Sequence, residues 1–87
     1  MQIRRKASAG TMQSSDLMVV VEPAAALEIH IDSTVKKQFE QLIREQILRT
    51  LDQLQVRAGR IQVADRGALD YAIAARIETA ITRASEV

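Results

Sequence analysis

The sequence has no cysteine and only one histidine, His30, among its 87 residues. The lack of cysteine excludes disulfides, zinc–thiolate sites and thiol catalysis by the chain's own side chains. A zinc site or a catalytic triad needs a histidine together with placed partner residues, and the sequence offers no such set. We therefore expect no metal site and no catalytic residue, and we interpret His30 as a solvated surface residue.

Long apolar runs, aromatic residues and an excess of one charge are also missing. No apolar stretch approaches the ~20 residues that span a bilayer, so we expect no membrane partner. Twelve basic and eleven acidic side chains are mixed along the chain, and only Phe39 and Tyr71 are aromatic. That mixture predicts no nucleic-acid partner. The basic start at Arg4–Lys6 precedes no signal-peptide core, and the cytoplasm is the expected location.

The chain is short enough to form one small domain. Polar, irregular sequence over residues 1–16 predicts a flexible N-terminal segment. Residues 17–22 form a β-branched apolar run that Pro23 ends, which predicts a strand. Alternating apolar and polar side chains predict two more strands, at residues 27–32 and 60–65.

The first two strands are close enough in sequence to pair as a hairpin. On the second strand, one set of alternating side chains is expected to face the core: Leu27, Ile29 and Ile31. Two amphipathic helices are predicted by the 3–4 spacing of apolar residues. The first helix is capped by Ser33 or Thr34, and its apolar stripe comprises Val35, Phe39, Leu42, Ile43, Ile47, Leu51 and Leu54. The second follows a turn at Gly67, and its stripe comprises Leu69, Ile73, Ile77, Ala80, Ile81 and Ala84.

The order strand, strand, helix, strand, helix predicts an α+β domain over residues 17–87. The simplest two-layer arrangement is a three-stranded sheet with two helices on one face. The glycines are isolated and form no phosphate-binding loop. Asp65 and Asp70 flank a turn and the start of a helix. Acidic residues at such positions usually cap the helix or interact favourably with its dipole.

Two adjacent hydroxyls, on Ser14 and Ser15, are the remaining chemical feature. Serines before a strand are common loop residues. In a mobile, polar segment they are also accessible to a modifying enzyme, which must bring a hydroxyl in line with its own donor substrate.

Three stretches, in the same order along the chain, resemble the acyl carrier protein (γ subunit) of citrate lyase. They are Ala9–Met18, which reads AGTMQSSDLM; Ser33–Phe39, which reads STVKKQF; and Asp65–Asp70 with Ala75–Glu78, which read DRGALD and ARIE. No single stretch is decisive, but together they span most of the chain.

The resemblance implies a carrier rather than an enzyme. In that family a phosphoribosyl-dephospho-CoA group is joined by a phosphodiester to the serine of a Ser-Gly-Asp element. That serine matches Ser14, because Asp16 fixes the register. Ser15 stands where glycine is usual, so it remains the alternative attachment site. The thiol of the group would carry acetyl and citryl thioesters while citrate is cleaved to acetate and oxaloacetate.

The implied partners are the citrate lyase alpha subunit (an acetyl/citryl transferase), the beta subunit (a citryl lyase) and the prosthetic-group transferase. Two alternatives stay open. One is the carrier subunit of malonate decarboxylase, which has a similar Ser-Gly-Asp element and group. The other is a non-covalent interaction module that presents an edge strand or a helix face. Four-helix acyl carrier proteins are set apart, because their attachment motif is Asp-Ser-Leu at a helix start.

Overall fold

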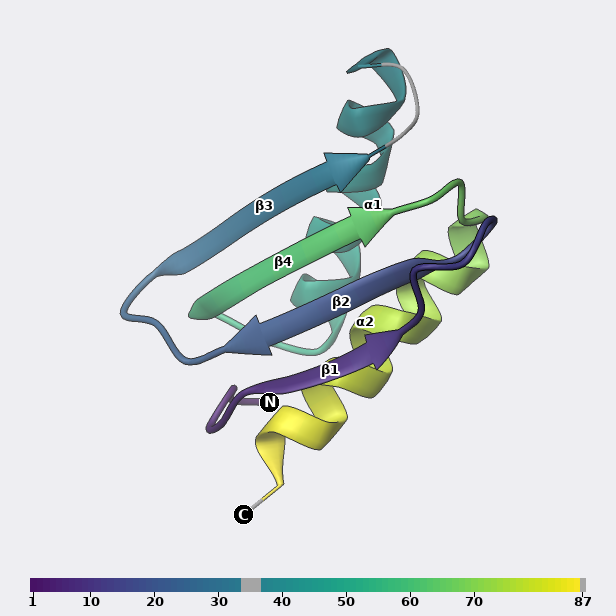
Figure 1. The fold of residues 1–87 in the computed structure, drawn as a ribbon. Helices are drawn as coiled ribbons and strands as arrows, with labels where there is room; N and C mark the ends of the chain where they lie inside the picture. The colour runs from purple at the N-terminus through teal and green to yellow at the C-terminus, as the bar shows by residue number, and fades with distance from the viewer. Residues whose placement is uncertain (34–36, 87) are drawn as a thin grey trace.

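Four strands and two helices make a two-layer domain in the computed structural model, which describes residues 1–33 and 37–86 (Figure 1). The elements are β1 (Ala7–Gly10), β2 (Leu17–Glu22), β3 (Leu27–Ser33), α1 (Lys37–Gln53), β4 (Gly59–Asp65) and α2 (Asp70–Ser85). Both helices lie on the same side of the sheet. The predicted α+β class with two helices is therefore confirmed. Neither described helix is long and apolar enough to cross a bilayer.

The sheet has four strands in the order β1-β2-β4-β3, so the predicted three-stranded sheet is wrong. β1 and β4 both pair with β2 in antiparallel fashion, while β3 and β4 are parallel. Parallel neighbours need a long crossover, and α1 provides it between β3 and β4. The predicted hairpin is also wrong, because β4 lies between β2 and β3.

The connection between β2 and β3 explains why the hairpin was predicted. Four residues, 23–26, join the two strands. Two strand spacings amount to roughly 10 Å, whereas four extended residues reach about 13 Å. A connection of this length can therefore join adjacent strands or step over one strand, and the sequence alone does not distinguish the two.

Strand β1 lies inside the segment that was predicted to be irregular. Its residues are small and have low β propensity, so local sequence gives no strand signal. The strand forms because it pairs with β2: Ala9 lies opposite Val19 in that ladder and is buried. Ile3 is buried as well, and the Arg4 amide donates to the Ala84 carbonyl at the end of α2. The mobility of residues 1–16 stays a prediction.

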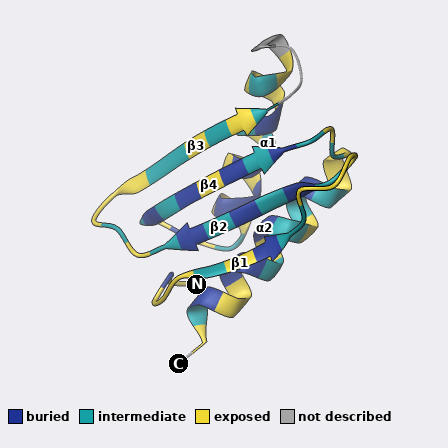
Figure 2. Ribbon diagram, in the orientation of Figure 1, coloured by how far each residue is buried: buried dark blue, intermediate teal, exposed yellow. Residues whose placement is uncertain are grey.

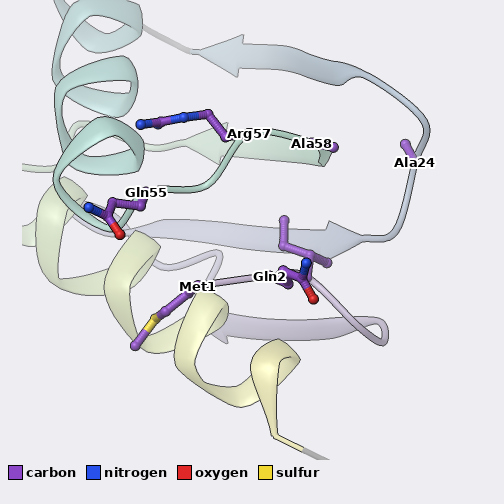
Figure 3. A pocket seen from close by; sticks show the side chains of 7 residues that line it. Met1, Gln2, Ala24, Gln55, Arg57 and Ala58 are labelled. Carbon is purple, nitrogen blue, oxygen red and sulfur yellow. The ribbon is translucent and has the colours of Figure 1, made fainter.

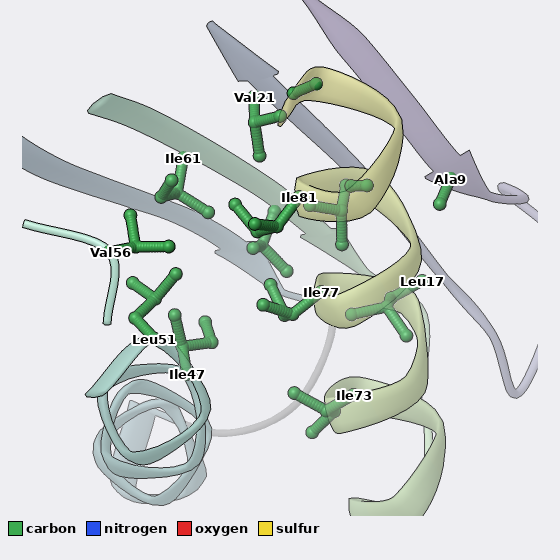
Figure 4. Close-up of a cluster of buried hydrophobic side chains, with 14 of the residues drawn as sticks. Ala9, Leu17, Val21, Ile47, Leu51, Val56, Ile61, Ile73, Ile77 and Ile81 are labelled. Carbon is green, nitrogen blue, oxygen red and sulfur yellow. The ribbon is translucent and has the colours of Figure 1, made fainter. Parts of the chain in front are cut away.

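The core lies between the sheet and the two helices (Figure 4). Alternate residues of β2 and β4 face it, as the burial colours of Figure 2 show for both strands. The fully buried large aliphatic side chains come from both layers: Leu17, Val19, Val21, Ile47, Leu51, Ile61, Ile77 and Ile81. The inward positions predicted for the second helix are confirmed at Ile73, Ile77, Ala80, Ile81 and Ala84.

Some residues predicted to face the core do not. Leu69 is exposed because it precedes α2, while Phe39 and Leu42 line a hollow of about 180 Å³ beside the β4–α2 loop. Leu27 is exposed at the start of edge strand β3, where Ile29 and Ile31 are half-buried against the core. Ser33 ends β3, where its hydroxyl donates to the Asp65 carboxylate, and Thr34 and Val35 lie outside the described residues.

Candidate functional site

The two serines lie on the connection between β1 and β2, residues 11–16, which we call the serine turn. It lies at the end of the sheet where β1 and β4 finish, β2 starts and α2 begins (Figure 1). The antiparallel pairing of β2 with β4 brings these ends together, since Leu17 starts β2 opposite Asp65 at the end of β4. The serine turn and the β4–α2 loop are therefore neighbours.

The backbone of the serine turn is closed and anchored. The Asp16 amide donates to the Gln13 carbonyl at 3.2 Å, which closes a four-residue turn. Ser15, the third residue of that turn, has φ of 66°, as a type II turn requires. The Ser15 amide donates to the Arg66 carbonyl at 2.8 Å, and the Arg66 amide donates to the Asp16 carbonyl at 2.9 Å. These two bonds continue the ladder between β2 and β4 into the β4–α2 loop.

The Asp16 carboxylate organises the side chains of the turn. It accepts hydrogen bonds from the Thr11 hydroxyl at 2.6 Å and from the Leu17 amide at 2.7 Å. Arg76 of α2 donates through Nε to Oδ1 at 3.2 Å and through Nη2 to Oδ2 at 3.0 Å. The hydrogen bond from Thr11, then those from the Leu17 amide and Arg76, lower the pKa of Asp16 from 3.8 to about 2. Asp16 is therefore a carboxylate at neutral pH.

Ser14 and Ser15 are both exposed. Among the described residues, none makes a hydrogen bond to either hydroxyl. The two serines differ in their backbones, because the Ser15 amide is bonded to Arg66 while Ser14 occupies the second position of the turn. Either hydroxyl is accessible to an external enzyme, and Ser14 lies at the tip of the turn.

Sequence reasoning identified Ser14, Ser15 and Asp16 but missed Thr11 and Arg76 as their supports. Arg76 is 60 residues from Asp16 in the sequence, so no local spacing relates the two. It lies in one of the stretches that carry the family resemblance, which is the only signal that marked this part of the chain. The contact becomes evident only when α2 is packed beneath β1 and β2.

Asp65 has a structural role, as its position at a turn predicted. Its side chain is buried and accepts hydrogen bonds from the Ser33 hydroxyl and the Ala68 amide, both at 3.0 Å. These bonds close the loop that supports Ser15. Asp70 is exposed at the first residue of α2.

Other candidate sites lie away from the serine turn. His30 is exposed, with Nε2 at 3.8 Å from the Glu28 carboxylate. The part of the chain that the structure describes holds no group of three or more histidine or acidic side chains suited to a metal ion. A pocket of about 340 Å³ opens at the opposite end of the sheet (Figure 3). No serine, histidine or carboxylate side chain is among the residues that line it: Met1, Gln2, Ile3, Ala24, Gln55, Arg57 and Ala58.

Known proteins resemble this chain along almost its whole length. The family model described as malonate decarboxylase delta subunit (MdcD) matches residues 4–84. The citrate lyase acyl carrier protein of Vibrio cholerae is 46% identical over 89 aligned positions, which cover 100% of this chain and 91% of that protein. The citrate lyase acyl carrier protein of Enterobacter sp. strain 638 is 53% identical, covering 99% of this chain and 90% of that protein.

A solved structure has the same fold. It is a crystal structure of a Pseudomonas malonate decarboxylase hetero-tetramer in complex with malonate, and one of its chains matches with a TM-score of 0.82. The match covers 95% of this chain and 87% of that chain, at 25% sequence identity.

Proposed function

We infer the function from one premise: the chain belongs to the family of citrate lyase acyl carrier proteins. The observation that carries the inference is identity of 46% and 53% to two such proteins along essentially the whole chain. The chain is accordingly a carrier subunit that holds an acyl group while other subunits of citrate lyase act on it. Citrate is cleaved to acetate and oxaloacetate by the complex, and this chain supplies no catalytic residue.

We propose Ser14 as the attachment site of a phosphoribosyl-dephospho-CoA group, through a phosphodiester. The Ser14 hydroxyl is exposed at the tip of a turn and makes no hydrogen bond within residues 1–33 and 37–86, which fits a covalent link to a long arm. The left-handed backbone of Ser15 suits the glycine of the Ser-Gly-Asp element that the resemblance implies, which supports the register that selects Ser14 over Ser15. When bound, the group supplies a thiol that holds the acyl chain as a thioester.

Attachment needs a second enzyme and an activated donor. The Ser14 Oγ would bond to phosphorus of a donor that carries the group as a phosphate anhydride. The anhydride P–O bond breaks, phosphate or pyrophosphate leaves, and the hydroxyl proton passes to a base of the transferase. The serine turn provides the hydroxyl and its orientation, and the transferase provides the donor site.

The expected partners of the loaded carrier are the alpha subunit, an acetyl/citryl transferase, and the beta subunit, a citryl lyase. A tethered acyl group stays at high effective concentration near both active sites. The carrier therefore needs an accessible attachment point and a stable body. A cytoplasmic location stays a prediction.

Intact mass of the protein purified from its native host, grown on citrate, tests the attachment site. The wild-type chain and Ser15→Ala are expected to carry one group, whereas Ser14→Ala is expected to have the bare mass. A bare wild-type chain from cells that use citrate would overturn the carrier function. An adduct that survives Ser14→Ala and is lost in Ser15→Ala would move the site by one residue.

A second candidate is the carrier subunit of malonate decarboxylase, because the family model and the solved structure both come from that enzyme. Sequence identity favours citrate lyase, at 46% and 53% against 25%. Affinity purification of the tagged chain from its native host separates the two. Co-purification of a citrate-cleaving subunit supports the first function, and co-purification of a malonate-decarboxylating subunit supports the second.

A further inference from the structure

We propose that Arg76 is a positioning residue for modification of Ser14: it holds Asp16, and through Asp16 the serine turn, in the conformation that the transferase recognises. The inference rests on the proposed function, since it concerns the attachment of the group to this turn. Arg76 would act without touching Ser14 or the donor.

Arg76 is the contact that joins the side chains of the serine turn to the helical layer. The other two donors to the Asp16 carboxylate, Thr11 and the Leu17 amide, belong to the turn or follow it directly. Arg76 comes from α2, 60 residues away. Within residues 1–33 and 37–86, it is the only side chain from outside the β1–β2 region that bonds Asp16.

The geometry of this pair suits a fixed orientation. Two guanidinium nitrogens reach both carboxylate oxygens, at 3.2 and 3.0 Å. Such a forked contact fixes the plane of the carboxylate, which a single ammonium group does not. The Asp16 side chain is only 17% exposed, so solvent competes less for it than for a fully exposed ion pair.

The serine turn needs such support because its backbone is locally unfavourable. Ser15 adopts a left-handed conformation that residues with a side chain seldom take. The two backbone bonds with Arg66 hold Ser15 and Asp16 at the end of the ladder. Without Arg76, which holds the Asp16 side chain, the turn would sample other conformations more often. If the transferase binds only the conformation seen in this structure, a smaller fraction of the carrier molecules can bind it. The apparent affinity of the transferase for the carrier then falls in proportion to that fraction.

The test compares Arg76→Gln and Arg76→Lys with a matched control, Arg83→Gln. Arg83 also lies on α2 and donates to the backbone of β1, at the Ser8 carbonyl at 2.8 Å, but it does not contact the serine turn. Purified transferase and an activated phosphate-anhydride donor are supplied, and the rate of mass gain is followed against carrier concentration.

For Arg76→Gln, the transferase KM for carrier is expected to rise about tenfold with kcat nearly unchanged, because fewer molecules hold the competent turn. Arg76→Lys should fall between Arg76→Gln and wild type, and Arg83→Gln should match wild type. A double-mutant cycle with Asp16→Asn should be strongly non-additive, since both variants break the same contact. Additive effects, or a fall in kcat alone, would overturn the inference.

Two measurements on the unmodified chain make the result independent of the transferase. By NMR, Arg76→Gln should speed hydrogen exchange at the Ser15 amide and raise the pKa of Asp16 toward its ordinary value. If wild type gains the group and Arg76→Gln gains it at the same KM, this inference fails and the proposed function stands. If wild type never gains the group, the proposed function fails and takes this inference with it.

Discussion

At the scale of single residues, Ser14 and Ser15 look equivalent in the sequence and are not equivalent in the structure. Both are exposed, but Ser15 has φ of 66° and a backbone amide bonded to Arg66, whereas Ser14 is not among the residues with positive φ. The sequence predicted an accessible pair of hydroxyls. The structure shows a left-handed backbone, and therefore a conformational cost, at Ser15 only.

Replacing Ser15 with glycine is expected to stabilise the protein. The left-handed conformation costs a side-chain-bearing residue about 1–2 kcal/mol, and the added freedom of glycine in the unfolded chain offsets about 0.5–1 kcal/mol of the relief. The net gain in the free energy of unfolding should be about 0.5 kcal/mol, measured as a higher urea midpoint at unchanged slope.

Ser14→Gly is the matched control, because its φ is not positive and only the entropic cost remains. It should lower the stability by about 0.5–1 kcal/mol. If both variants shift the urea midpoint in the same direction, the left-handed strain assigned to Ser15 is wrong.

At the scale of elements, the sequence predicted those with a strong local pattern and missed what depends on pairing. The alternating apolar residues of β4 predicted a strand, and the 3–4 spacing in α2 predicted its inward face; the structure confirms both. The residues of β1 carry no such pattern, and their strand exists because β2 offers a ladder and α2 covers Ala9. After α1 the chain forms β4, which inserts between β2 and β3. No local sequence pattern indicates which strands β4 will pair with. The same holds for the contact of Arg76 with Asp16.

The β1–β2 hairpin depends on Gly10, which has φ of 94°. A Cβ at this position would overlap the Leu17 carbonyl oxygen, which also accepts the Thr11 amide at 3.1 Å. Gly10→Ala is therefore expected to cost more than about 3 kcal/mol of unfolding free energy, from backbone strain and overlap together. Thermal and urea unfolding of the purified variant measure the loss.

Gly67→Ala isolates the backbone contribution to that loss. Gly67 has a similar φ of 92°, but a Cβ there would meet no atom within 4 Å. Its cost should be about 1–2 kcal/mol. Equal losses for the two alanine variants would mean that the overlap with Leu17 relaxes away and that the hairpin is less rigid than its contacts indicate.

At the scale of the whole molecule, the serine turn lies at one end of the sheet, and the N-terminus and the last turn of α2 lie toward the other (Figure 1). The Met1 amine donates to the Leu54 carbonyl, and the Arg4 amide donates to the Ala84 carbonyl near the end of α2. The β2–β3 connection lies at that same end, because Ala24 and Met1 line one pocket. The serine turn therefore lies at the end of the sheet that faces away from Met1 and from the β2–β3 connection.

A folded domain inserted into the β2–β3 connection, between Ala24 and Ala25, should therefore leave the rate of Ser14 modification within about twofold of wild type, because exposed loops tolerate insertions. The same domain inserted after Gly67 should abolish modification, since Arg66 bonds the backbone of Ser15 and the insert would cover the serine turn. Circular dichroism and thermal unfolding confirm that both insertions fold, and intact mass after incubation with the transferase measures modification. A folded carrier that loses modification with the insert at Ala24 would mean that the transferase recognises the far end of the sheet as well as the turn.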